Sequence, residues 1–157
     1  MPELGDVFHT GVLVSDLDDG MRRIGQTLGV TWTRIGEREL RVRGPDDTAV
    51  VRLRFVYSRQ GPHRIELIES SPGSLWDPAH QHVSGGAHHL GVWCDDLVAG
   101  ARELEAQGGV LLATLDVPGR ELAGFSYHRM PSGELIELVD RRSSDVFTAW
   151  FSGGDAP

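Results

Sequence analysis

The sequence predicts an α+β fold in which one βαβββ module occurs twice in tandem. The first observation is an internal duplication, because segments 9–30 and 89–110 align without gaps and share nine of twenty-two residues. The second is that each copy ends in an apolar strand with a related motif, RIELIE at 64–69 and LIELVD at 135–140. The third is the order of periodic segments in both halves, which is one strand, one helix and three strands.

The first half begins with a strand and a capped helix. Asp16 or Asp18 can accept hydrogen bonds at the helix start, and apolar residues recur on one face as far as Leu28, after which Gly29 ends the helix. Glycine and proline turn signals separate the extended segments that follow. We expect strands at 8–14, 30–42, 48–57 and 64–69.

The second half repeats this order, with strands expected at 87–94, 110–116, 124–129 and 135–139 and a helix at 97–107. A connecting segment rich in Ser, Pro, Gly and His separates the halves, and one helical turn is expected there at Leu75-Trp76. The chain therefore divides into a first module, a linker, a second module and a C-terminal tail, at 1–69, 70–86, 87–141 and 142–157.

The tail has no counterpart in the repeat. Phe147, Trp150 and Phe151 follow the spacing of one helical face, so an apolar surface there must be covered. Packing on its own module is the first expectation, followed by a subunit interface and then by a lid over a cavity.

Composition and charge narrow the class of protein. A chain of 157 residues buries one core or two small ones. A net charge of −8 without a basic run argues against nucleic acid and anionic membranes as partners, which leaves a small molecule. The single cysteine, Cys94, is expected to be a buried apolar residue, and no disulfide can form within the chain. The N-terminal sequence MPELGDVF has no leader pattern and no segment is long enough to cross a bilayer, which predicts a cytoplasmic protein.

Four residues form a candidate metal site. His9 recurs as His89 in the aligned segments, and Glu66 recurs as Glu137 in the matching strands. Because strand side chains alternate between faces, each Glu can face a cavity while its neighbours pack under the helices. Imidazole nitrogens and carboxylate oxygens suit Zn²⁺, Ni²⁺, Co²⁺, Mn²⁺ and Fe²⁺, and two carboxylates neutralise a dication.

Other residues compete for these positions. His88 is an alternative to His89, but only His89 aligns with His9 and shares a strand face with Gly91. Glu69 is disfavoured because it points away from the face of Glu66. The histidines without a repeat partner are expected at the surface or along the cavity: His63, His80, His82 and His128.

The four motifs resemble the vicinal oxygen chelate superfamily, which includes glyoxalase I, methylmalonyl-CoA epimerase, extradiol dioxygenases and the fosfomycin and bleomycin resistance proteins. The resemblance covers residues 7 to about 140 and lies in FHTGVLVSDL, IELIE, GAHHLGVWCDDL and PSGELIELVD. It implies paired βαβββ modules that curl into a half-open barrel around one divalent metal ion. It also implies a homodimer and a substrate that chelates the metal through two adjacent oxygens.

The ligand set favours the isomerase, epimerase and lyase branch. Extradiol dioxygenases typically use two His and one Glu, whereas Glu66 supplies a fourth ligand here. Glyoxalase I is similar in ligand identity, while IELIESSPGSLWDP followed by GGAHHLGVWCDDL resembles methylmalonyl-CoA epimerase. The epimerase usually has Gln in place of Glu66, and its acidic residue on the third strand aligns with Thr48.

The resemblance implies removal of a proton next to a carbonyl, with the metal stabilising the enediolate that forms. Glu66 or Glu137 is the expected base, and the metal is expected to be Ni, Co, Zn or Mn. One alternative is a resistance-type protein that binds a drug or metabolite without chemistry, although such proteins generally lack the metal ligands. Another is extradiol cleavage with iron, in which Glu66 is a bystander.

The cavity walls are expected to include Leu13, Trp93 and one face of 51–55. In that last segment, Arg52 and Arg54 alternate with apolar residues. Inward arginines would favour an anionic substrate, and outward arginines would leave an apolar pocket. The alternation is compatible with either orientation.

Overall fold

The computed structural model describes residues 4–80 and 86–157. Its strands are β1 (Leu4–Val14), β2 (Gly36–Arg43), β3 (Thr48–Tyr57), β4 (Arg64–Glu69), β5 (Ala87–Cys94), β6 (Val110–Leu115), β7 (Phe125–Arg129) and β8 (Leu135–Asp140). Its helices are α1 (Leu17–Leu28), α2 (Leu97–Ala106) and α3 (Ser144–Phe151), with short 3₁₀ turns η1 (Pro78–His80) and η2 (Arg141–Ser143). Within those ranges, no helix combines the length and apolar character that crossing a bilayer requires.

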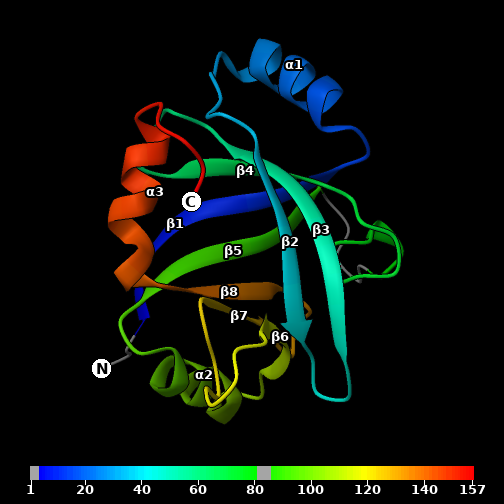
Figure 1. Cartoon of the computed structure of the whole chain (residues 1–157), viewed down its shortest axis with the longest axis vertical. Coiled ribbons are helices and arrows are strands. Elements are labelled where there is room, and N and C mark those ends of the chain that lie inside the picture. The colour runs from blue at the N-terminus through cyan, green and yellow to red at the C-terminus, as the bar shows by residue number, and fades with distance from the viewer. Residues whose placement is uncertain (1–3, 81–85) are drawn as a thin grey trace.

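The strands form one barrel in the order β1-β4-β3-β2-β6-β7-β8-β5. Each half contributes one parallel pair, β1 with β4 and β5 with β8, and the antiparallel β1–β5 pair joins the halves. The α+β class and the repeated βαβββ order are therefore confirmed (Figure 1). The barrel expected to be half-open closes on its far side, where β2 and β6 pair over two residue positions, Val42 with Leu115 and Arg43 with Thr114.

Three local expectations differ from the structure. The strand expected over 30–42 begins only at Gly36, because the preceding residues bridge to the end of β3 through Trp32 and Ser58. The indole of Trp32 donates to the carbonyl of Met21, so this stretch packs beside α1 instead of extending the sheet. The helical turn expected at Leu75-Trp76 lies at η1 instead, and β1 starts at Leu4.

Both main helices begin with an aspartate cap, which the sequence predicted for α1 only. The Asp16 carboxylate accepts from the amide of Asp19 to cap α1, and Asp96 caps α2 in the same way. Gly29 ends α1 with a left-handed φ of 67°, which a residue without Cβ adopts at little cost.

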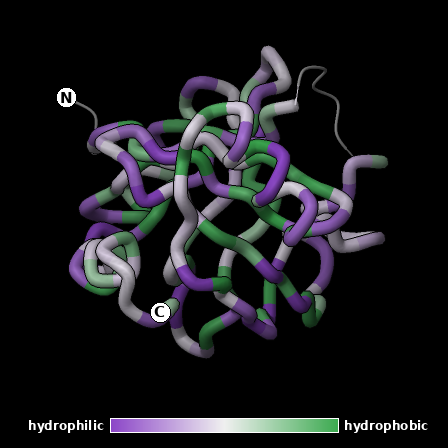
Figure 2. The backbone as a smooth tube through the Cα atoms, turned by 90° about the horizontal axis from the view of Figure 1, so that it is seen from above, coloured by the Kyte–Doolittle hydropathy of each residue, from purple (hydrophilic) through white to green (hydrophobic). Residues whose placement is uncertain are grey.

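The alternation of strand side chains creates an inner and an outer layer. Outward residues pack under the helices, with Leu67 and Val56 in a cluster near α1 and Cys94 and Leu138 in a cluster with α2. The expectation that Cys94 is buried is confirmed. Figure 1 shows α1 and α2 at opposite ends of the molecule, and Figure 2 shows hydrophobic and hydrophilic residues interspersed along the backbone. The strand side chains on the other face of the sheet line the interior of the barrel.

The tail packs on the barrel through α3. Trp150 and Phe151 are buried in one cluster with Phe8, Tyr57 and Val139, which come from both halves. The indole nitrogen of Trp150 donates to the carbonyl of Arg34 at 2.9 Å. The tail therefore packs on its own chain, but across both modules and not on its own module alone, and Phe147 of the same helix also lines the interior cavity.

Candidate metal centre

Two rows of residues cross the inner face of the barrel, one from each half. Successive cross-strand partners in the first row are Tyr57, Glu66, Gly11 and His89, running from β3 to β5. Successive partners in the second row are Tyr127, Glu137, Gly91 and His9, running from β7 to β1. Each row thus contains one Glu from its own half and one His from the other half, so the duplicated chain builds a single shared centre.

The glycines of these rows make room for the imidazole rings. A Cβ on Gly11 would overlap the ring of His89, and a Cβ on Gly91 would overlap the ring of His9. The repeated His-x-Gly pattern therefore has a steric basis, because each module supplies a histidine and leaves space for that of its neighbour.

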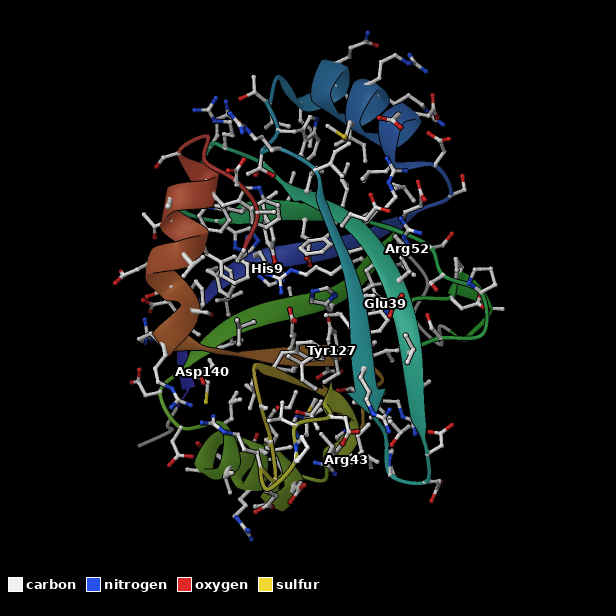
Figure 3. All side chains as sticks on the ribbon, viewed as in Figure 1. His9, Glu39, Arg43, Arg52, Tyr127 and Asp140 are labelled. Carbon is white, nitrogen blue, oxygen red and sulfur yellow. The ribbon has the colours of Figure 1, made fainter. Side chains whose placement is uncertain are left out.

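The four predicted side chains converge on one point. Nε2 of His9 lies 3.3 Å from Oε2 of Glu66 and 3.1 Å from Oε2 of Glu137. Nε2 of His89 lies 3.1 and 3.2 Å from the same two oxygens, and the two Nε2 atoms are 2.9 Å apart. Figure 3 shows His9 among the strands in the middle of the molecule. In the described part of the chain, this is the only group of His, Cys, Asp or Glu arranged to hold a metal ion.

The spacing of the four potential ligand atoms suits coordination of a divalent cation better than hydrogen bonding among the side chains themselves. Oε2 of Glu66 and Oε2 of Glu137 are buried and have no hydrogen-bond partner among the described residues, although imidazole nitrogens are close. Two Nε2 atoms that face each other cannot both carry protons at 2.9 Å. A cation with ligand bonds of about 2.0–2.2 Å spaces neighbouring donors by roughly 3–3.5 Å, which matches the observed separations. Two imidazoles and two carboxylates could therefore hold one such ion.

The metal-free site is strongly polarised. Burial alone would lower the pKa of His89, but Glu137 and Glu66 outweigh burial and raise it to about 9. Burial likewise opposes the ionised form of Glu66, yet the neighbouring His89 and His9 hold the pKa of that carboxyl well below its usual range. Without a metal ion, protons on the imidazoles compensate the negative charge of the two carboxylates. Metal binding is expected to displace these protons.

His88 supports the site instead of competing for it. Nε2 of His88 lies 3.0 Å from the carbonyl oxygen of Leu75, which only accepts, so this nitrogen carries the proton. Burial and the charge of His89 lower the pKa of His88 to about 4, so its Nδ1 has a free lone pair. Nδ1 of His89 lies 2.9 Å away and donates to it. Once His89 loses its Nε2 proton, as metal binding requires, this contact holds it in the tautomer whose Nε2 lone pair faces the centre.

The remaining candidates lie elsewhere. Glu69 accepts from the amide of Leu17 and from Arg54 on the outside of the barrel, as its strand position predicted. His63 is an exposed partner of Thr10, while His80 lies in η1. His82 lies outside the described residues.

His128 differs from its expectation at the surface or along the cavity. It is fully buried, and strand alternation places it on the face of β7 opposite Tyr127, toward α2. Burial lowers the pKa of this imidazole.

Tyr57 and Tyr127 were not singled out from the sequence. Each is buried beside the Glu of its own row, and their rings meet the imidazoles of His9 and His89 edge-on at 5.2 and 5.1 Å. Burial and the two carboxylates raise both tyrosine pKa values well above the usual range, so the hydroxyls stay protonated. A signal was present, because they are the only tyrosines in the chain and precede Glu66 and Glu137 by nine and ten residues.

A cavity of about 210 Å³ opens from the centre into the barrel. Glu66 and Glu137 line it together with both tyrosines, and most of the remaining wall is apolar. Its aromatic lining residues beyond the tyrosines are Phe55, Trp76, Phe125 and Phe147. The site is therefore a polar cluster inside a largely apolar chamber, an arrangement typical of small-molecule sites.

The wall differs in part from expectation. Leu53 and Phe55 of the 51–55 segment do line the cavity, but Leu13 and Trp93 are not among its lining residues. Trp93 instead stacks on the ring of Phe8 at 3.9 Å. The two β3 arginines, whose orientation the sequence left open, both point outward, as their ion pairs show.

Arg52 pairs with Glu37 at the exposed surface, and Arg54 pairs with Glu69 and Asp18. Both arginines therefore point out of the barrel, and the inner face of β3 is apolar.

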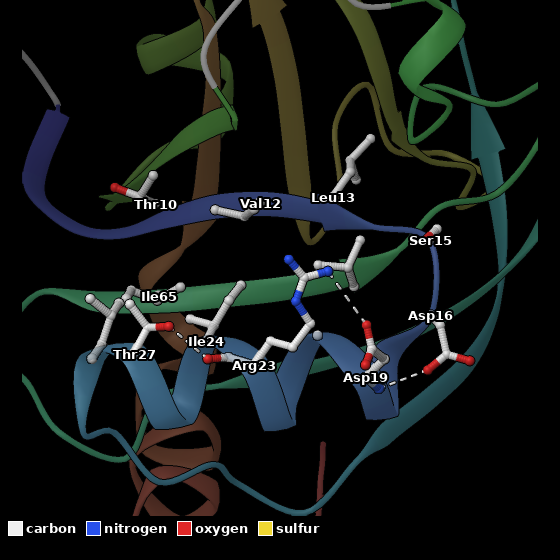
Figure 4. Close-up of a pocket in the computed structure, with 13 residues that line it drawn as sticks. Thr10, Val12, Leu13, Ser15, Asp16, Asp19, Arg23, Ile24, Thr27 and Ile65 are labelled. Atoms are coloured by element: carbon white, nitrogen blue, oxygen red, sulfur yellow. Dashed lines mark hydrogen bonds and ion pairs between the residues drawn. The ribbon is translucent and has the colours of Figure 1, made fainter.

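A second hollow of about 740 Å³ lies between α1 and the neighbouring strands β1 and β4 (Figure 4). Its walls include Val12, Ile24 and Ile65, with Asp19 and Arg23 toward the helix side. None of the four converging residues borders it. Of these two hollows, only the smaller interior cavity is lined by members of the converging group, Glu66 and Glu137.

Comparison with solved structures finds the same fold. Methylmalonyl-CoA epimerase from Mycobacterium tuberculosis superposes with a TM-score of 0.55 at 21% identity, over 89% of this chain and 90% of that one. A hypothetical protein from Bacillus halodurans also gives 0.55 at 21% identity, over 86% and 93%. An epimerase variant from Streptomyces coelicolor in complex with 2-nitronate-propionyl-CoA gives 0.53 at 20%, over 87% and 97%.

The sequence itself identifies the family. No curated protein matches the chain. A family profile described as the glyoxalase/bleomycin resistance protein/dioxygenase superfamily matches residues 8–127, a span that includes His9, Glu66 and His89. The resemblance found in the motifs is thus confirmed, and the chain belongs to the glyoxalase/bleomycin resistance protein/dioxygenase superfamily.

Proposed function

We propose that the protein is a metal-dependent isomerase, epimerase or lyase of the glyoxalase type, which removes a proton next to a carbonyl group. The observation that carries this proposal is the convergence of two imidazoles and two carboxylates, all buried, beside an apolar cavity. We propose His9, Glu66, His89 and Glu137 as the metal ligands.

A bound divalent ion would supply Lewis acidity that stabilises negative charge developing on the carbonyl oxygen of the substrate. Oε2 of Glu66 or Oε2 of Glu137 would take the proton from carbon and return it, because both oxygens are buried and lack a hydrogen-bond partner among the described residues. The low pKa of both carboxyls keeps them ionised and able to act as bases at neutral pH.

The protein matrix supports this role. Neutral Tyr57 and Tyr127 lie beside the two glutamates and offer hydroxyl donors that can orient each carboxylate. The largely apolar walls offer few hydrogen-bond partners to water, so charge that develops in the cavity would be screened less than in bulk solvent.

The alternatives have weaker support. Glu66 and Glu137 lie at nearly equal distances from both histidines, which gives no reason to treat Glu66 as a bystander in an iron dioxygenase. A pure binding protein would have no need for two buried carboxylates that converge with two imidazoles. The homodimer, the cytoplasmic location and the module boundaries remain predictions.

Proton exchange with solvent tests the proposal directly. Loss of the C–H signal in D₂O is followed by NMR for hemithioacetals of 2-oxoaldehydes and for acyl-CoA thioesters, with Ni, Co, Zn or Mn added. We expect metal-dependent exchange that falls by about 10²–10⁴-fold in Glu66→Gln or Glu137→Gln. Glu134→Gln, which changes an exposed residue just before β8, is the matched control.

Metal content is measured in each variant, so that loss of the base is separated from loss of the ion. Exchange that needs no metal, or that survives in both glutamine variants, contradicts the proposal.

A further inference from the structure

Among the described residues that line the interior cavity, Arg38 is the only arginine, and it is exposed to solvent at the cavity wall. Arg38 lies on β2, where alternation puts it on the same face as Leu40 and Val42, and Leu40 also lines the cavity. The sequence drew attention to Arg52 and Arg54, which point outward, and gave no signal for Arg38.

Arg38 is unusual among the arginines of the chain. All fifteen basic residues are arginines. Twelve of them form an ion pair or donate to a carbonyl: Arg22, Arg23, Arg34, Arg41, Arg43, Arg52, Arg54, Arg59, Arg64, Arg102, Arg141 and Arg142. Arg38 has no such partner in residues 4–80 and 86–157, and neither Arg120 nor Arg129 lines the cavity. An unpaired guanidinium at a cavity wall is available for a ligand oxyanion.

We propose that Arg38 binds a carboxylate of the substrate, so that the preferred substrate is a compact apolar molecule with a reacting carbonyl at one end and an anion at the other. The reacting end rests on the function proposed above, whereas the anion site rests on Arg38 alone. A guanidinium and a carboxylate form paired charge-assisted hydrogen bonds, which lysine does not reproduce.

The register gives the length of this substrate. Arg38 pairs with Leu53, and Tyr57, four residues further along β3, pairs with Glu66. Four residues of strand span about 13 Å. Because Arg38 and the two glutamates line the same cavity, a substrate that contacts both is expected to have polar ends on the order of 10 Å apart.

The size and lining of the cavity also indicate the size and character of the part of the substrate between its two polar ends. Its volume of about 210 Å³ exceeds the ~150 Å³ that holds a benzene ring and falls below the ~300 Å³ at the lower end of drug-sized pockets. Six aromatic residues line it, including Phe55, Trp76 and Phe125. These surfaces favour one ring, or an apolar chain of similar size, between the two polar ends.

Two probes that differ only in the remote anion test this inference. The first is 3-phenylpropanohydroxamic acid, whose two adjacent oxygens can chelate a metal, and the second carries an added carboxymethyl group at the para position of the ring. Their dissociation constants are measured by titration calorimetry on the cobalt-loaded protein and on the metal-free protein. We expect the carboxylated probe to bind the loaded protein at least about tenfold more tightly.

Variants test whether the tighter binding of the carboxylated probe depends on Arg38. We expect Arg38→Gln to bring the ratio of the two constants close to one and Arg38→Lys to restore it in part. Arg129→Gln removes an exposed arginine outside the cavity that has no ion-pair partner among the described residues, and its ratio should match the wild type.

A wild-type ratio near one, an unchanged ratio in Arg38→Gln, or no binding of the carboxylated probe to either form would overturn the inference. Failure of the proposed function looks different: the protein would retain no cobalt, yet the ratio measured on the metal-free protein would still respond to Arg38.

Discussion

At the scale of single residues, the site depends on hydrogen bonds that fix the orientation and tautomer of its histidines. Replacing His88 by Phe keeps a buried ring but removes the acceptor for Nδ1 of His89. We expect the affinity for Zn²⁺ or Co²⁺ to fall by about 10–100-fold, as is typical when a partner behind a metal ligand is lost. Competition with a chelator of known affinity measures this change.

His63→Phe is the control for this variant, because His63 is exposed and its ring contacts the hydroxyl of Thr10, away from the candidate metal centre. Equal metal affinity in His88→Phe and the wild type would show that His89 needs no such support.

The glycines opposite the histidines are a second requirement at this scale. In Gly91→Ala, the added methyl group meets the ring of His9, which is enclosed by the barrel and cannot move aside freely. We expect loss of the bound metal and a fall of about 1–3 kcal/mol in the free energy of unfolding. Elemental analysis and urea denaturation measure the two effects.

Leu90→Ala changes the neighbouring residue, whose side chain is exposed, and should retain the metal. A Gly91→Ala protein with a full metal complement would mean that the ring of His9 is not fixed where the structure has it.

At the scale of elements, α3 is held to the barrel mainly by Trp150. This side chain is fully buried, contacts Tyr57 edge-on at 5.3 Å and donates to the Arg34 carbonyl. We expect Trp150→Ala to lower the free energy of unfolding by about 3–5 kcal/mol. Val146→Ala on the same helix removes an exposed side chain and should change it by less than about 0.5 kcal/mol. Similar unfolding curves for the two variants would mean that α3 does not pack as described.

The elements also show what a sequence can predict. The strands at 48–57, 64–69 and 87–94 have the expected limits because alternating apolar residues and turn signals bound them locally. The segment before Gly36 was predicted as strand because its composition suits one, but Trp32 is drawn to α1 by packing and a hydrogen bond. Such tertiary contacts have no local signature.

At the scale of the whole molecule, the duplication made the candidate metal site predictable. The same two residue types at matching positions in both copies identified His9, Glu66, His89 and Glu137, and the barrel brings all four together. Arg38 and the tail contacts of α3 could not be found in this way, because neither has a repeat partner. Tyr57 and Tyr127 do have one, but their significance depends on which strands become neighbours.

The most direct test of this account is the metal content of the purified protein. After incubation with Ni, Co, Zn or Mn and removal of excess ion, elemental analysis should find about one equivalent per chain in the wild type. The His89→Ala, Glu137→Ala double variant should bind essentially none, while circular dichroism verifies that it remains folded. A wild-type protein that binds none of these ions, or a folded double variant that binds as much as the wild type, would contradict the central claim that these four residues form a metal centre.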